Sequence, residues 1–292
     1  MRLAADENVV AVPSQQCEVP NVFPGATMTY TFKSGDPCWV ELFTSDPERS
    51  IAFYGELLGW TAEQAGPEYG GYITFSKDGE PVAGGMRNDG SSGGPDQWTI
   101  YLASTDAEAT TSAATANGGR VVVPPMQVGE LGTMAVLGDP SGAGVGVWQP
   151  GGHPGFGALG EVSGGRWSDH VGNPSWFELH TPAYDQALKF YREVFGWQDP
   201  FTVSDIPEFR YTTIHSTSPM LGGVMDSAAF LPDGSPGGWR VYFGVEDVDA
   251  SVKTLVSLGG SVEREPENSP YGRMAAVIDP GGVRFSLGGN NS

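Results

Sequence analysis

The pattern of apolar and polar positions near the start of the chain predicts a strand followed by an amphipathic helix. Residues 39–45 alternate between the two faces of a strand. Asp46 and Pro47 then provide a helix cap and a proline at the first helical position, and Gly59 provides a helix end. The apolar residues between them recur at helical spacing and are Ile51, Tyr54, Leu57 and Leu58.

The same pattern continues along the chain and predicts an α+β fold. Helices are also expected at 106–116, 184–195 and 247–258. Further strands are expected at 72–76, 81–87, 98–104, 120–124, 132–138, 143–148, 175–181, 201–205, 209–215, 220–226, 239–245, 260–264, 272–278 and 282–287. The order is strand, helix and about three strands, four times over. Two such βαβββ units per copy are expected to close a curved sheet into a cup.

The second half of the chain repeats the first. Residues 39–60 and 176–197 align at a constant offset and share Trp, Glu, Leu, Thr, Phe, Tyr, Glu, Gly and Trp. A repeat this long indicates a duplicated domain. We therefore predict an N-terminal extension at 1–35, a first domain at 36–150, a Gly-rich linker at 151–172 and a second domain at 173–292.

Composition and charge limit the classes of function that the chain could have. The 292 residues suit two domains. A formal net charge of −20 without a basic cluster argues against nucleic-acid binding and against anionic membranes. No apolar run approaches the ~20 residues of a membrane span, and no secretory signal is apparent. We expect a cytoplasmic monomer or homodimer that binds a small molecule. Cys17 and Cys38 could pair, although reduced thiols are favoured.

Two short motifs carry a family resemblance. The helix exit Phe-Tyr-x-x-x-x-Gly-Trp and the turn Asp-Pro-x-Gly occur in both copies. They resemble the vicinal oxygen chelate superfamily of glyoxalase I, bleomycin-resistance proteins and extradiol dioxygenases. The resemblance covers about 36–150 and 173–290 and looks closest to tandem glyoxalase-like proteins of actinobacteria, often labelled hydroxylases. It implies the fold and says little about the reaction.

The resemblance also implies where a metal would be held. The family places ligands at the start of the first strand of a unit and late in its last strand. By counting, this chain has at those positions Trp39, Trp176, Thr99, Arg240, Gly146 and Ser286, and the remaining ligand strand carries Gly84-Gly85 and Gly222-Gly223. None of these is a good ligand for a divalent metal. We expect no metal and no cofactor.

The resemblance further implies that the strand face carrying the glutamate present in both copies lines each cup. The ligand-binding candidates are Trp39, Glu41, Phe43 and Tyr101 in cup one, and Trp176 and Ser286 in cup two. The catalytic candidates are Glu178, His180, Arg240 and Tyr242. Glu and His two residues apart on a strand project side by side and can tune each other. An arginine there could hold a phenolate or enolate oxygen.

Structural roles for the same residues remain open. Glu41 and Glu178 occupy the same place in both copies, so each could simply be hydrogen-bonded to a tyrosine, Tyr101 or Tyr242.

The four histidines also have alternative interpretations. His180 replaces a phenylalanine of copy one, and a lone histidine is commonly a satisfied pocket residue. His215 could complete a metal site with His180 and its neighbouring glutamate. His153 and His170 lie in the predicted linker and are expected to be solvated.

Two functions from different classes fit these residues. One is a metal-independent enzyme of secondary metabolism or detoxification, with lyase, isomerase or cyclase chemistry on an oxygen-rich, aromatic or polyketide-like metabolite. The other is a non-catalytic protein of the bleomycin-resistance type that sequesters an aromatic drug. A scaffold acting through partners is a third. The acid–base residues of copy two favour the enzyme.

Overall fold

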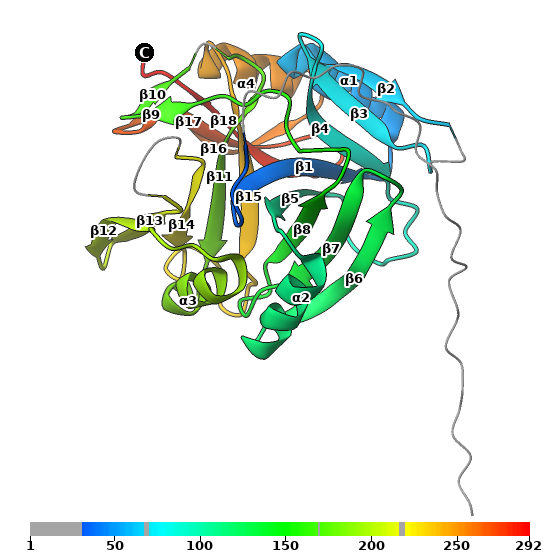
Figure 1. The fold of residues 1–292 in the computed structure, drawn as a ribbon. Helices are drawn as coiled ribbons and strands as arrows, with labels where there is room; N and C mark the ends of the chain where they lie inside the picture. Colours follow the sequence, from blue (N-terminus) through cyan, green and yellow to red (C-terminus); the bar gives the residue numbers. More distant parts are fainter. Residues whose placement is uncertain (1–30, 67–69, 169, 216–219) are drawn as a thin grey trace, which may run out of the picture.

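The computed structural model describes residues 31–66, 70–168, 170–215 and 220–292. These residues form two eight-stranded mixed sheets and four helices, which confirms the predicted α+β fold in tandem copies (Figure 1). The predicted N-terminal extension lies outside the described residues as far as residue 30, and so does Cys17. Among the described residues, no helix is long and apolar enough to cross a membrane.

The first sheet contains both units of copy one. Its strands, in spatial order, are β2 (Thr61–Gln64), β3 (Ile73–Lys77), β4 (Glu80–Arg87), β1 (Pro37–Thr44), β5 (Gln97–Ala103), β8 (Gly144–Pro150), β7 (Gly132–Gly138) and β6 (Arg120–Val128). Its helices are α1 (Pro47–Leu58) and α2 (Ala107–Ala116). The sheet stays open, because its end strands β2 and β6 are not paired with each other.

The second sheet repeats this order. Its strands are β12 (Phe201–Ile206), β13 (Phe209–Thr213), β14 (Gly222–Asp226), β11 (Pro174–Thr181), β15 (Gly238–Gly244), β18 (Arg284–Gly289), β17 (Gly272–Ile278) and β16 (Ser261–Ser269). Its helices are α3 (Tyr184–Phe195) and α4 (Val248–Ser257). A short hairpin of β9 (Val162–Ser163) and β10 (Arg166–Trp167) lies between the copies in sequence.

The helix signals in the sequence act as predicted. Asp46 caps α1 by accepting a hydrogen bond from the backbone N–H of Arg49 at 3.2 Å. Gly59 ends this helix in the left-handed region at φ 71°, where glycine is favoured. Strand β2 was not predicted from the sequence, since all of its side chains are exposed and show no alternation.

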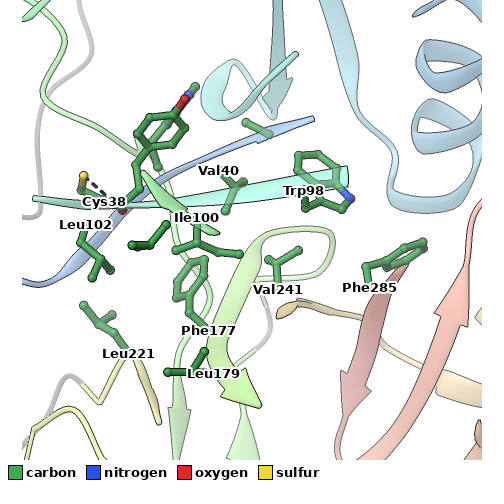
Figure 2. Packing of buried hydrophobic residues seen from close by; sticks show 14 of the residues in the cluster. Cys38, Val40, Trp98, Ile100, Leu102, Phe177, Leu179, Leu221, Val241 and Phe285 are labelled. Carbon is green, nitrogen blue, oxygen red and sulfur yellow. Dashed lines mark hydrogen bonds between the residues drawn. The ribbon is translucent and has the colours of Figure 1, made fainter. Parts of the chain in front are cut away.

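One hydrophobic core joins the two copies. The central strands of both sheets turn apolar side chains toward each other, including Val40 and Ile100 from copy one and Phe177 and Val241 from copy two (Figure 2). Helix α1 contacts α4, and α2 contacts α3 (Figure 1). The opposite face of each central strand is thereby left for other contacts, because successive strand residues alternate between faces.

The family motifs hold this interface together. The tyrosine of each Phe-Tyr pair donates to the aspartate of the other copy's Asp-Pro turn, from Tyr54 to Asp279 at 3.0 Å and from Tyr191 to Asp139 at 3.2 Å. All four residues are buried. The tyrosines of the helix exits are therefore core residues, and the motifs link the two copies.

Candidate functional site

Each sheet has a second face, opposite to the one that packs in the interface between the copies. In copy one the cross-strand partners Glu41 and Thr99 share this face with Trp39 and Tyr101, which are also paired. Phe43 lies on the same face by alternation. This surface is called face one below. It carries the residues that were predicted from the sequence to line cup one.

Face two is the matching surface of copy two. Glu178 pairs with Arg240 and Trp176 pairs with Tyr242, in the same register as their counterparts. His180 follows on the same face. The structure therefore brings the four catalytic candidates onto one surface. Ser286 joins them, since it is the partner of Tyr242 on the adjacent strand β18.

Glu178 is the centre of face two. Its Oε1 accepts a hydrogen bond from Tyr242 Oη at 2.8 Å, and its Oε2 accepts one from Tyr211 Oη at 2.7 Å. Trp176 Nε1 donates to the same Tyr211 hydroxyl at 2.9 Å. His180 Nε2 lies 2.7 Å from Oε1, as an ion-pair contact and not as an aligned hydrogen bond. The carboxylate is thus held from three sides.

These contacts determine the protonation state of Glu178. Burial alone would raise the pKa of this carboxyl, but His180 and the two tyrosine hydroxyls outweigh burial and lower the pKa to about 2. Burial is also the main cause that raises the pKa of Tyr211 and Tyr242, so both keep their protons and donate. Face two therefore holds an ionised carboxylate beside an imidazole.

Arg240 is already engaged on face two. Its Nη2 lies 2.9 Å from Glu263 Oε2, and the other oxygen of that glutamate lies 2.7 Å from Nε of Arg284. A guanidinium has five N–H donors, so a single ion pair leaves some of them able to bind a ligand oxygen. Ser286 is fully buried beside Tyr242, and its Oγ has no hydrogen-bond partner among the described residues.

Face one repeats the cluster without the histidine. Tyr101 Oη donates to Glu41 Oε1 at 3.3 Å, and Trp39 Nε1 donates to Tyr72 Oη at 3.2 Å. Burial raises the pKa of Glu41 to about 7, and hydrogen bonds from the Tyr72 and Tyr101 hydroxyls offset only part of this shift. Glu41 is therefore largely protonated near pH 6, whereas its counterpart Glu178 is ionised.

The sequence analysis missed Tyr72 and Tyr211. The constant offset that aligns the two copies does not align these tyrosines, so they did not stand out as a repeated pair. The glycines of the neighbouring strand were the available signal. A Cβ at Gly84 would collide with the Tyr72 hydroxyl, and one at Gly223 would collide with the Tyr211 hydroxyl. Glycine there lets each tyrosine reach its glutamate.

The residues at the family's metal positions do not fit a divalent metal. In copy one an aromatic ring fills that space, since a Cβ at Gly146 would collide with the Tyr101 ring. Across the described ranges, no group of three or more His, Cys, Asp or Glu side chains could hold a metal ion. The hypothesis of a site completed by His215 is wrong, because His215 Nε2 lies 2.6 Å from Asp36 Oδ1.

The predicted linker contributes to face one. His153 was expected to be solvated, and this prediction is wrong, because its ring is buried with its centroid 4.5 Å from that of Trp39. Trp148 Nε1 donates to the His153 carbonyl at 2.9 Å, which holds the segment in place. Trp39 is only 4% exposed, whereas Trp176 is partly exposed. His170 is exposed, as predicted.

Comparison with known proteins identifies the family. The Glyoxalase/Bleomycin resistance protein/Dioxygenase superfamily matches residues 38–147 and 169–287. The chain belongs to this superfamily and carries its domain twice, as the motifs predicted.

Several relatives span nearly the whole chain. The anthracycline biosynthesis protein DauV of Streptomyces sp. strain C5 is 38% identical over 88% of this chain and 94% of its own length. DnrV of Streptomyces peucetius, with the same description, is 37% identical at the same coverage. A putative glyoxylase of Mycobacterium bovis, CFP32, is 33% identical over 88% of this chain and 95% of its own length.

Solved structures share the fold at low sequence identity. The 2,3-dioxygenase LapB from Pseudomonas sp. KL28 superposes with a TM-score of 0.58 at 16% identity, covering 89% of this chain and 94% of its own. The Mn(II)-bound glyoxalase from Novosphingobium aromaticivorans gives 0.56 at 17% identity, covering 87% and 83%. At such identity the likeness shows the fold alone.

Proposed function

We propose that this protein is a metal-independent enzyme of secondary metabolism that acts by proton transfer on an aromatic polyketide of the anthracycline type. Two relatives that span almost the whole chain are described as anthracycline biosynthesis proteins. Such compounds are flat and rich in carbonyl and phenol oxygens. The observation that carries the proposal is the Glu178–His180 pair, which face one lacks.

His180 is the general base in this proposal. The carboxylate 2.7 Å from Nε2 favours the tautomer that carries its proton on Nε2, so the other ring nitrogen, Nδ1, holds the lone pair that accepts a proton. The ionised carboxylate 2.7 Å away stabilises the imidazolium that forms. Tyr211 and Tyr242 hold the carboxylate in position. This arrangement suits removal of a proton from carbon next to a carbonyl, as lyases, isomerases and cyclases require.

Arg240 receives the charge that this step creates. As the C–H bond breaks, its electron pair moves toward the carbonyl oxygen and forms an enolate, and the proton goes to His180. The guanidinium donors not used by Glu263 can bind that oxygen. The enolate is then reprotonated, eliminates a group or attacks a second carbonyl.

Sequestration of a drug is the second candidate function. Face one favours it, because it has the same aromatic cluster around Glu41 but no histidine and no arginine at the equivalent positions. A protein using only such surfaces would bind its ligand and return it unchanged.

The two functions are separated by the fate of the ligand. The purified protein should be incubated with intermediates of an anthracycline-type pathway, followed by chromatography and mass spectrometry. A changed mass or retention time that depends on the protein supports the enzyme. Tight binding with complete recovery of unchanged ligand would exclude it and support sequestration.

We expect the protein to contain no stoichiometric metal. The reason is the donor set, since the family's ligand positions carry Trp39, Trp176, Thr99, Arg240, Gly146 and Ser286, none of which is a good ligand for a divalent metal. Elemental analysis of protein purified without chelator should find well under one Zn, Ni, Fe or Mn per chain. One tightly bound ion per chain, or activity abolished by a chelator and restored by a metal, would show this prediction to be wrong.

A further inference from the structure

The hairpin between the two copies packs against one end of face two. Its second strand, β10, contacts β18 and carries Trp167, which is only 6% exposed. The indole lies over Gly288 and Gly272, because a Cβ added to either glycine would collide with it. Gly288 is on face two by alternation from Ser286. A tryptophan from outside the sheet therefore closes this end of the face.

Copy one fills the equivalent place from its own strand. In the parallel pairing of β8 with β5, Trp148 has the register position that Gly288 has on β18. A Cβ at Gly132, the first residue of β7, would collide with the Trp148 ring, just as one at Gly272, the first residue of β17, would collide with Trp167. The hairpin thus supplies to copy two a ring that copy one supplies itself.

Hydrogen bonds hold Trp167 at both its backbone and its ring. The backbone N–H donates to Asn290 Oδ1 at 3.0 Å, and Asn290 Nδ2 donates to the Trp167 carbonyl at 3.1 Å. The ring Nε1 donates to the Tyr271 carbonyl at 2.9 Å. The hairpin itself is closed by the N–H of Glu161, which donates to Ser168 Oγ at 2.9 Å. The indole is therefore a fixed wall.

This wall contacts Tyr242, which binds the proposed catalytic pair. The rings of Trp167 and Tyr242 have centroids 6.5 Å apart, and Tyr242 is 3% exposed. The Tyr242 hydroxyl donates to Glu178 Oε1 at 2.8 Å, and His180 Nε2 lies 2.7 Å from that same oxygen. Because the phenol and the imidazole share one carboxylate oxygen, a shift of the Tyr242 ring moves the atom that His180 contacts.

We propose that Trp167 is a positioning residue for the reaction on face two, where it holds Tyr242 so that the phenol fixes the Glu178 oxygen facing His180. The reaction itself rests on the proposed function, whereas the chain of contacts from Trp167 to Glu178 rests on geometry alone. A misplacement of about 1 Å can cost about 10²-fold in rate, so a wall remote from the reacting atoms can control turnover.

Replacement of the indole tests this role kinetically. Trp167→Leu keeps an apolar side chain in the space but supplies no planar ring, and should lower kcat by about 10- to 100-fold. KM should change little, because the buried side chain is not available to a ligand. Trp167→Phe restores a ring and should recover most of the rate. Trp148→Leu is the matched control, since Trp148 is 8% exposed, and it should be destabilised similarly with kcat near the wild-type value.

A double-mutant cycle shows whether Trp167 acts through Tyr242. In a Tyr242→Phe background the hydroxyl is already lost, so adding Trp167→Leu should lower kcat by less than about twofold more. If the indole acted only by excluding water from face two, its loss would lower kcat by the same factor in both backgrounds.

The titration of Glu178 tests the same contacts without turnover. Carboxyl chemical shifts followed by NMR report its pKa, which is about 2 in the wild-type protein. A carboxylate that loses a hydrogen-bond donor is protonated more easily, so Trp167→Leu should raise the midpoint, whereas Trp148→Leu should leave it unchanged. In the Tyr242→Phe background, Trp167→Leu should cause no further rise.

Three results would overturn the inference: a Glu178 titration that Trp167→Leu leaves unchanged, an equal loss of kcat in Trp148→Leu, or effects that multiply fully in the cycle. Absence of turnover in the wild-type protein is a different outcome. If the Glu178 titration still responded to Trp167→Leu and not to Trp148→Leu, the contacts from Trp167 to Glu178 would be supported and the proposed reaction would be refuted.

Discussion

His180→Phe is expected to lower turnover by about 10²–10⁴-fold, the usual contribution of a general base. The fold should be retained, because Phe43 occupies the same position on face one. Both positions also have a methionine as their neighbour on the adjacent parallel strand, Met86 beside Phe43 and Met225 beside His180. The loss is therefore chemical, since the packing that the new phenylalanine meets already exists in the other copy.

The variant also makes an electrostatic prediction. Without the imidazole, Glu178 keeps only its two tyrosine donors, which is the arrangement around Glu41. Its pKa should then rise from about 2 toward the value of about 7 that Glu41 has. Carboxyl chemical shifts followed by NMR as a function of pH report this change directly, with the Glu41 signal of the same sample as an internal reference.

Phe43→His is the matched control. It places a histidine beside Glu41 but leaves Thr99 opposite, where face two has Arg240. Turnover should stay close to that of the wild-type protein. If His180→Phe turned over substrate at the wild-type rate while binding it normally, His180 would not be the base. If Phe43→His lost activity as well, the reaction would not belong to face two.

The sequence was sufficient to predict the faces because the strands are regular. Alternation placed Glu41 beside Phe43, and Glu178 beside His180, and the observed register agrees. The end of α3 was also predictable, because a glycine at the end of an apolar helical pattern commonly ends the helix. Gly196 does so in the left-handed conformation, at φ 75°. These are local signals, in which each residue and its neighbours determine the outcome.

The contacts around those residues were not predicted, because they join distant parts of the chain. Tyr211 reaches Glu178 from another strand, and Arg240 is engaged by Glu263 across the sheet. His153 lies in a Gly-rich segment that indicated solvent exposure, yet it packs against Trp39. In each case the partner is set by the tertiary fold, and spacing along the sequence carries no information about it.

The largest effect on stability is expected for Trp197→Ala, at about 3–5 kcal/mol for removal of a buried aromatic ring. Trp197 is 2% exposed, and its ring stacks on that of Tyr191 with centroids 4.7 Å apart. Its Nε1 donates at 2.9 Å to the carbonyl of Gly35, which directly precedes the first strand of the other copy. The substitution removes both the ring packing within copy two and a hydrogen bond between Trp197 and the segment that leads into copy one.

Denaturant unfolding of Trp197→Ala should show one transition at a lower midpoint, because a single core spans both copies. Trp60→Ala should behave alike, since Trp60 Nε1 donates to the Gly172 carbonyl at 2.8 Å in the symmetric position. Phe201→Ala is the control, because Phe201 is 53% exposed and its loss should cost less than about 0.5 kcal/mol. Two separate transitions, of which only one shifts, would instead mean that the copies unfold independently and that these tryptophans stabilise only their own domains.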